Sequence, residues 1–168
     1  AFGDNNDGMA MFRVNGKNVL VVNNEYTNRG IMWGNRASKL PESADDVNKG
    51  KAAHGVSVIE VSHQQGQWQI IKDSPLNRRI TPDTDMAITG PATGHPLMRT
   101  TADPKGVTAK GTWNNCGNGQ TPWGTYLTCE ENFNGYFSAS DENYPLSRQH
   151  KRYGISHKDW GYGWAQTD

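Results

Sequence analysis

The side chains best suited to chemistry in this sequence come at the end of one apolar segment. Residues 121–132 read TPWGTYLTCEEN, so a predicted strand ends in a thiol, two carboxylates and an amide. In an extended chain Cys129 and Glu131 project to one face and Glu130 to the other, and a kink after Cys129 would gather them at one site. Carboxylate and amide oxygens suit hard cations such as calcium, whereas a thiolate favours a transition metal. The alternative is a core cysteine followed by solvated charges at a strand end.

A second apolar segment ends in a similar way. Residues 19–22 read VLVV and are followed by Asn23, Asn24 and Glu25. A single glutamate at a strand end is usually a surface residue, but the surroundings of Glu25 match those of Glu130. Two such strand ends could converge in a central channel. We therefore take Glu25 as a candidate ligand and Asn24 as a candidate substrate-binding residue.

Two histidines and one aspartate are weaker candidates. His54 stands at the start of a predicted strand and His95 in a Gly-His-Pro turn, and either could bind a metal or contact a substrate. A histidine hydrogen-bonded to nearby backbone is the commoner finding, and we place His54 ahead of His95. The opening DNNDG at residues 4–8 lacks the later glutamate of a calcium-binding EF-hand loop. Asp7 is accordingly interpreted as part of a polar turn.

The two cysteines leave alternatives open. Cys116 and Cys129 could form a disulfide if the protein is exported, or Cys129 could be a free ligand with Cys116 buried. Without a Cys-x-x-Cys pair a structural zinc site is not expected. The sequence also lacks the Gly-x-Ser-x-Gly elbow of serine hydrolases, and it has neither a Walker A motif nor a Rossmann glycine pattern.

Short segments of alternating polarity, bounded by Gly, Asn and Pro, are expected to position these residues. Asn15-Gly16 favours a type I′ turn because both residues accept positive φ, which predicts a hairpin of residues 9–14 and 17–22. A second hairpin is predicted for residues 56–61 and 68–71, turning at Gln65-Gly66. Further strands are expected at 124–129 and 133–137, although Asn134-Gly135 could equally turn the chain within the second of these segments. Within residues 35–51 we expect one short helix, capped by Ser43.

Composition limits the fold and function classes. The 17 basic and 17 acidic side chains balance, which excludes a broad electrostatic grip on nucleic acid or acidic lipid. No apolar run approaches the roughly 20 residues that a membrane-spanning helix needs. Six tryptophans can supply core area in a chain of low mean hydropathy. We expect an all-β fold, with residues 1–168 forming a single partial β-propeller domain; a β-sandwich is the alternative.

Several collinear motifs resemble those of the PhoX-type alkaline phosphatases. The most specific are NNCGNG at residues 114–119 and the TPWGTYLTCEEN segment at 121–132. Weaker matches are VVNNEYT at 21–27, HGVSV at 54–58 and GPATGH at 90–95. The resemblance runs over nearly the whole chain. It implies a β-propeller metalloenzyme, exported to the periplasm or beyond by the twin-arginine route, that hydrolyses phosphate monoesters with iron and calcium.

Site roles follow from the same resemblance. Cys129 would be an iron ligand, and Glu25, Glu130 and Glu131 would be carboxylate ligands. Asn24 stands where members of the family often have a histidine, so that histidine's role is not carried over. Family members are several times longer, and this chain begins with Ala1 rather than Met, without features of a signal peptide. We therefore expect a processed product or a fragment that has little activity alone.

Overall fold

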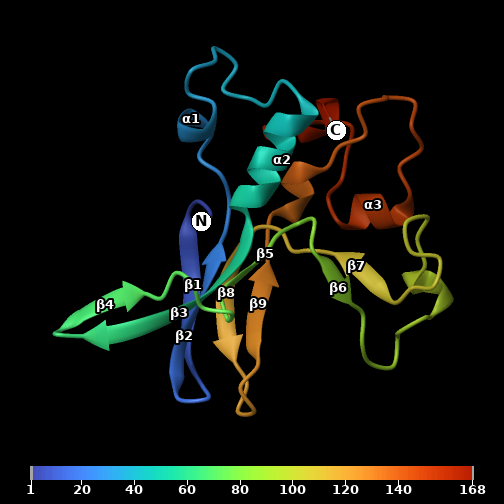
Figure 1. The fold of residues 1–168 in the computed structure, drawn as a ribbon. Helices are drawn as coiled ribbons and strands as arrows, with labels where there is room; N and C mark the ends of the chain where they lie inside the picture. Colours follow the sequence, from blue (N-terminus) through green and yellow to red (C-terminus); the bar gives the residue numbers. More distant parts are fainter. Residues whose placement is uncertain (1, 168) are drawn as a thin grey trace.

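The computed structural model describes residues 2–167, which are mostly β-structure with short helices (Figure 1). In the largest sheet β1 to β4 form an antiparallel meander, and β5 pairs with β3 beside β4. Two smaller antiparallel sheets consist of β6 with β7 and of β8 with β9. The strands are Asn6–Val14 (β1), Lys17–Asn24 (β2), Gly55–Gln64 (β3), Gln67–Ile70 (β4), Arg78–Ile80 (β5), Asp85–Ala87 (β6), Thr108–Lys110 (β7), Asn115–Gln120 (β8) and Tyr126–Glu130 (β9).

The helices are short and lie mainly beyond one end of the large sheet (Figure 1). They are α1 (Arg29–Met32), α2 (Ala44–Ala53), α3 (Arg148–Arg152) and the 3₁₀ helices η1 (Pro96–Met98), η2 (Phe133–Tyr136) and η3 (Trp164–Gln166). Among residues 2–167 no helix has the length and apolar character needed to cross a bilayer. The predominance of strands agrees with the all-β class expected from the sequence.

Both predicted hairpins are confirmed. β1 and β2 are joined by Asn15 and Gly16, whose φ values are 48° and 80°. β3 and β4 are joined by Gln65 and Gly66, with φ values of 51° and 78°. Positive φ at both central residues gives these turns the twist that matches the flanking strands. The first hairpin then fixes which residues of β1 lie beside the end of β2.

The predicted helix between residues 35 and 51 is confirmed, with its end shifted slightly. α2 begins after Ser43, whose hydroxyl accepts a hydrogen bond from the N–H of Asp46 at 3.2 Å. Arg36 anchors the preceding loop, since its guanidinium donates to both carboxylate oxygens of Asp46 at 2.6 and 2.9 Å. The helix ends at His54, which connects it directly to β3.

Of the strand and the turn at Asn134-Gly135 that the sequence left open for residues 133–137, the strand is wrong, because this segment forms the 3₁₀ helix η2. Asn132 turns the chain with a φ of 49°, and its carbonyl accepts a hydrogen bond from the N–H of Gly135. The turn carries Tyr136 into an aromatic cluster with Trp164, where it is buried. The burial of this ring outweighs the local alternation of polarity.

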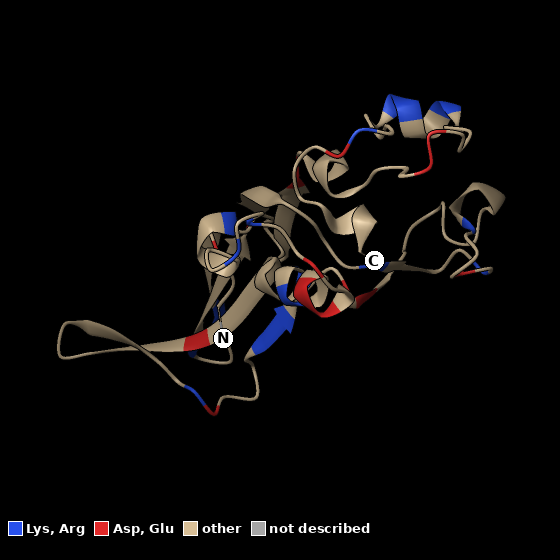
Figure 2. Cartoon of the chain, turned by 90° about the horizontal axis from the view of Figure 1, so that it is seen from above, with Lys and Arg blue, Asp and Glu red and all other residues tan. Residues whose placement is uncertain are grey.

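Two apolar clusters stabilise the fold. One lies on a face of the paired strands β2 and β3 and is built from Val19, Val21, Val56 and Val58. The other joins α2 to the C-terminal segment and is mainly aromatic, with Val47, Tyr136 and Trp164 buried and Trp113, Phe133 and Tyr162 packed against them. Acidic and basic residues both occur on several helices, strands and loops (Figure 2). Their numbers are equal in the sequence.

Candidate metal centre

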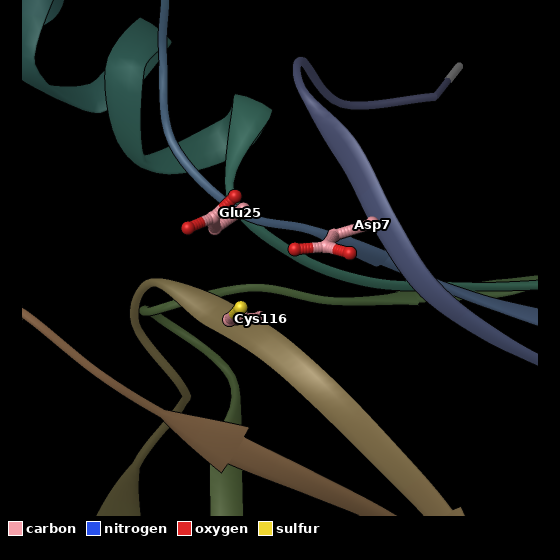
Figure 3. A group of neighbouring side chains, drawn as sticks. All are labelled: Asp7, Glu25 and Cys116. Carbon is pink, nitrogen blue, oxygen red and sulfur yellow. The ribbon is translucent and has the colours of Figure 1, made fainter.

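Three elements bring a thiol and two carboxylates together. Asp7 lies on β1, Glu25 directly follows β2, and Cys116 lies on β8 (Figure 3). One potential ligand atom from each of the three lies within 4.8 Å of the other two. Asp7 is exposed, while Glu25 and Cys116 are half-buried. The group therefore lies where solvent and a small ion have access to it.

Strand pairing explains why Asp7 meets Glu25. The regular register of β1 with β2 runs from Val14 opposite Lys17 to Met9 opposite Val22, and it then shifts so that Asn6 pairs with Asn24. Asp7 lies within this irregular stretch. In a regular strand, successive side chains point to opposite faces of the sheet. A bulge changes the direction of the side chains beside it, and bulges are common next to functional sites. The start of β1 is thus placed against the end of β2.

The pKa values of Cys116 and Glu25 are both raised within this group. The pKa of Cys116 is raised to about 11 by a hydrogen bond to Asp7, then by burial and by the negative charges of Asp7, Glu131 and Glu25. The pKa of Glu25 is raised by burial, then by the charges of Asp7 and Glu131 and by a hydrogen bond to Asp7. A concentration of negative charge that favours protonation equally favours a bound cation.

Asn23 holds β8 in place beside this group. Its side chain is fully buried, and its Nδ2 donates to the carbonyl oxygens of Cys116 at 2.8 Å and of Gly117 at 3.1 Å. Its Oδ1 accepts hydrogen bonds from the hydroxyls of Tyr126 and Thr128, each at 2.9 Å. One buried amide therefore joins β2 to both β8 and β9 and fixes the backbone that carries the thiol.

Of the acidic residues at the end of β9, Glu131 is near the group and Glu130 has a structural partner. Glu131 influences the pKa of both Glu25 and Cys116 through its charge, and its backbone N–H donates to the carbonyl of Asn114. The Oε1 of Glu130 accepts a hydrogen bond from the backbone N–H of Trp113 at 2.9 Å. The arrangement makes Glu131 the better placed of the two as a further ligand.

The two cysteines are both free. Cys129 is exposed near the end of β9, and it is not among the residues that gather with Asp7 and Glu25. Cys116 occupies the position beside the carboxylates that the sequence suggested for Cys129. Whether Cys129 binds iron stays a prediction; among residues 2–167 it belongs to no group of three potential ligand side chains.

Asn24 and His54, expected to contact substrate, are both completely buried. The Nδ2 of Asn24 donates to the side chain of Asn6 at 2.7 Å, and its Oδ1 accepts from the hydroxyl of Ser57 at 2.7 Å. His54 bonds through its ring nitrogens to the carbonyl of Gly50 at 2.7 Å and to the hydroxyl of Tyr136 at 2.8 Å. These contacts favour structural roles, and a substrate contact by either stays a prediction.

The remaining weak candidates are placed as follows. His95 precedes η1, and its Nδ1 accepts a hydrogen bond from the N–H of Leu97 at 3.2 Å. Asp7, interpreted from the sequence as part of a polar turn, is a strand residue within the candidate site. The donor set of Asp7, Glu25 and Cys116 fits a metal, because carboxylates suit calcium and iron alike and a thiolate adds preference for a transition metal.

The sequence contained a signal for Asp7 but little for Cys116. Counting back from the two-residue turn at Asn15-Gly16 places Asp7 opposite the end of β2, one residue from Glu25. For Cys116, the pairing of β8 with β9 shifts between Asn115 and Asn118. A one-residue shift reverses which face a side chain occupies, so spacing alone could not place this thiol.

Comparison with known proteins identifies the family of this chain. Residues 1–167 match the family alkaline phosphatase PhoX. The chain is also similar to Pseudomonas fluorescens PhoX, solved in complex with vanadate, a transition state analogue, with 46% sequence identity and a TM-score of 0.90. The similarity covers 99% of this chain and 29% of that protein. No curated protein matches the chain. The extent of the family match and the identity to a solved member together show that this chain belongs to the PhoX alkaline phosphatase family.

Proposed function

We propose that the chain supplies part of the metal centre of an enzyme that hydrolyses phosphate monoesters. The observation that carries this proposal is the convergence of Asp7, Glu25 and Cys116 in a member of a phosphatase family. The similar Pseudomonas protein binds vanadate as a transition state analogue, which is consistent with a site for a phosphoryl group. Because the chain corresponds to 29% of that protein, the proposed activity is that of the whole enzyme.

Iron and calcium are the metals we propose. Cys116 would hold iron through its thiolate, and Asp7 and Glu25 would hold iron or calcium through carboxylate oxygens, with Glu131 in reach to complete the set. Bound cations neutralise the charge that develops on phosphoryl oxygens and lower the pKa of bound water. We propose Cys116 as the thiolate ligand in preference to Cys129, because Cys116 lies beside the carboxylates.

The residues of this chain would act by holding charge in a fixed place. Asn23 fixes the carbonyl of Cys116, and β1 fixes Asp7 against the end of β2. Such preorganisation avoids the cost of reorganising ligands as the phosphoryl group reacts. Since phosphoryl transfer depends mainly on positioning and charge neutralisation, residues that only hold metal can account for most of the catalysis.

Two further parts of the proposal concern the whole protein. We propose that the β1–β4 meander is one blade of a β-propeller, because four-stranded antiparallel meanders build such blades. We also propose that the protein is exported and that residues 1–168 alone have little phosphatase activity. A robust metal-dependent rate from these residues alone would contradict the last point.

A carbohydrate-binding module or a calcium-stabilised structural domain would be the alternatives. The first needs exposed aromatic rings that share a face, and Trp113 and Trp123 are the candidate rings. Trp113 instead packs against Tyr136 and Trp164, with ring centroids 5.1 and 5.4 Å away, whereas Trp123 is 79% exposed. These positions give the first alternative no support. A calcium-stabilised domain would not use the thiol.

Elemental analysis of the full native protein, purified without a metal-chelating tag, tests the proposal. We expect iron and calcium, with iron lost in Cys116→Ser and retained in the matched variant Cys129→Ser. Iron lost only in Cys129→Ser would instead support the ligand suggested by the sequence alone. Calcium without iron in the native protein would favour the structural domain and overturn the proposed centre.

A further inference from the structure

A cavity of about 570 Å³ opens beside the candidate metal centre. Its walls come from the segment that follows β2 and from the loop before η3. The residues of its wall that matter here are Tyr26, Thr27, Arg29, Lys39, Trp160 and Tyr162. None of these residues belongs to the proposed ligand set, so the cavity has a role still to be assigned.

Glu25 connects the cavity to the centre. Tyr26, in the wall, is the next residue along the chain. Burial raises the pKa of Tyr162, and the charge of Glu25 contributes to the rise while that of Arg29 opposes it. Tyr162 is therefore within electrostatic reach of both a proposed ligand and a cation of the cavity. A substrate held at the centre could extend into this space.

Positive charge gathers at the cavity. The guanidinium of Arg29 donates to the carbonyl oxygen of Gly161, which orients it at the wall. Lys39 makes no ion pair with any residue in the range 2–167. The ammonium of Lys158 lies 4.8 Å from the centroid of the Trp160 ring. Arg29 and Lys39 both line the cavity, and two cations around one space favour an anionic ligand.

The nearby carboxylates do not cancel this charge by direct pairing. Asp159 accepts hydrogen bonds from the backbone N–H groups of Gly161 and Gly163. Asp4 accepts from the backbone N–H of Asn28 at 2.7 Å and from that of Asn5 at 2.9 Å. Both carboxylates thus stabilise the backbone of the loops that form the wall of the cavity.

Aromatic and unpartnered polar surfaces complete the cavity. Trp160 is 57% exposed and Tyr26 is 40% exposed, although both are large rings that gain from contact with an apolar or planar group. The hydroxyl of Thr27 is buried without a hydrogen-bond partner in the part of the chain that the structure describes. Buried polar groups are normally satisfied, so this one points to a missing partner.

We infer that this cavity binds the leaving group of the substrate and selects phosphate monoesters of aromatic alcohols that carry a second negative charge. The inference rests on the proposed function. In the reaction water oxygen bonds to phosphorus, the P–O ester bond breaks, and a proton from water ends on the released alcohol. The aromatic part would lie against Trp160 and Tyr26, and its own anionic group would meet Arg29 and Lys39.

Because the wall has both aromatic rings and cationic side chains, it disfavours ligands that are only aromatic, only polar or only anionic. A neutral sugar would use the aromatic rings but gain nothing from the two cations of the wall. Inorganic phosphate would use the cations but leave the rings exposed. Only an aromatic anion uses both, and a guanidinium suits either a carboxylate or a phosphate as its partner.

Kinetics with a matched pair of substrates test the inference in the full native protein. We expect a lower KM for 4-carboxyphenyl phosphate than for phenyl phosphate. The double variant Arg29→Gln, Lys39→Gln should remove that difference by raising the KM for 4-carboxyphenyl phosphate about tenfold. The KM for glycerol 2-phosphate, which has neither feature, should stay within about twofold. Equal effects on all three substrates would overturn the assignment.

Equilibrium binding of naphthalene-1-sulfonate, measured by calorimetry, separates this inference from the proposed function, because the probe has no phosphoryl group to hydrolyse. We expect weaker binding in Trp160→Leu and in the Arg29→Gln, Lys39→Gln variant. Arg78→Gln is a matched control, since Arg78 lines a different cavity. Arg29-dependent binding without any phosphatase activity would support the cavity and contradict the proposed function. Binding lost only in Arg78→Gln would overturn the inference.

Discussion

The Nδ2 group of Asn23 donates a 2.8 Å hydrogen bond to the carbonyl oxygen of Cys116, 93 positions further along the chain. The bond links the end of β2, which delivers Glu25, to the strand that delivers the thiol. Because Asn23 is completely buried, its amide could not exchange these contacts for water without opening the sheet. The geometry of the candidate centre therefore depends on a residue that is not itself a proposed ligand.

Replacing Asn23 by alanine should destabilise the protein and loosen the centre. The change removes the donor to the carbonyls of Cys116 and Gly117 and the acceptor for the Thr128 hydroxyl, and it leaves the Tyr126 hydroxyl only the carbonyl of Gly8 as its partner. We expect a loss of roughly 2–4 kcal/mol in the free energy of unfolding, measured by denaturant titration. Asn18→Ala on the same strand is the control, since its side chain makes one exposed bond to Arg13. Equal losses in the two variants would contradict the argument.

The thiol of Cys116 should react slowly in metal-depleted protein at mildly alkaline pH. Its pKa of about 11 results first from a hydrogen bond to Asp7 and then from burial and neighbouring negative charge, so little thiolate is present. Asp7→Asn removes one of those charges and should accelerate alkylation of Cys116 by about tenfold. Peptide mapping by mass spectrometry gives the rate for each cysteine.

Cys129 provides the internal control for that experiment, because Asp7 is not grouped with it. Its alkylation rate should be the same in the native protein and in Asp7→Asn. An unchanged rate at Cys116, or an equal acceleration at both cysteines, would show that Asp7 does not govern the Cys116 thiol.

The sequence predicted local structure well where two residues determine it. Asn15-Gly16 and Gln65-Gly66 each adopt the positive φ values that the hairpins require, and Ser43 caps the helix expected after it. Such features depend on neighbours in the chain. By contrast, the sequence could not choose between a strand and a turn at residues 133–137, where η2 forms, because the packing of Tyr136 against Trp164 depends on residues distant in the chain.

The candidate site was harder to predict because it depends on pairing between distant strands. Glu25 was identified from its place at a strand end, and it lies in the site. Choosing between Cys116 and Cys129 required the register of β8 with β9, which contains a shift beside Cys116. The sequence around Asp7 is typical of a polar turn, and only the pairing of β1 with the end of β2 places Asp7 in the site.

Gly55 is predicted to tolerate no side chain. Its φ is +98°, and an added Cβ would overlap the carbonyl oxygen of Ile80 on β5. We expect Gly55→Ala to cost roughly 3 kcal/mol or more, since backbone strain and a clash with main-chain atoms combine. Gly16→Ala is the matched control, because its φ of +80° is also unfavourable but no atom lies within 4 Å of an added Cβ. It should cost about 1–2 kcal/mol, and thermal unfolding of both variants distinguishes the contributions.

Stability should fall as the pH is lowered from about 6.5 to about 4, because His54 is buried in its neutral form. Burial, the largest cause, lowers its pKa to about 4, with a small further contribution from the charge of Arg79. In the unfolded chain the pKa returns to its ordinary value near 6.5, so the unfolded state binds the proton first as the pH falls. Between pH 6.5 and pH 4 the free energy of unfolding should therefore fall by roughly 3 kcal/mol. Above pH 6.5 the titration of His54 should not change the stability.

Denaturant titrations at several pH values check the prediction, with His54→Gln as the variant. Glutamine does not titrate, so His54→Gln should be less stable at neutral pH but should lose the part of the pH dependence that arises from this site. His63→Gln is the matched control, because His63 lies near the tip of the β3–β4 hairpin against Trp68 and away from the aromatic cluster. If His54→Gln keeps the full decline between pH 6.5 and 4, the decline must arise from other groups, and the neutral, buried state of His54 would contribute nothing to it.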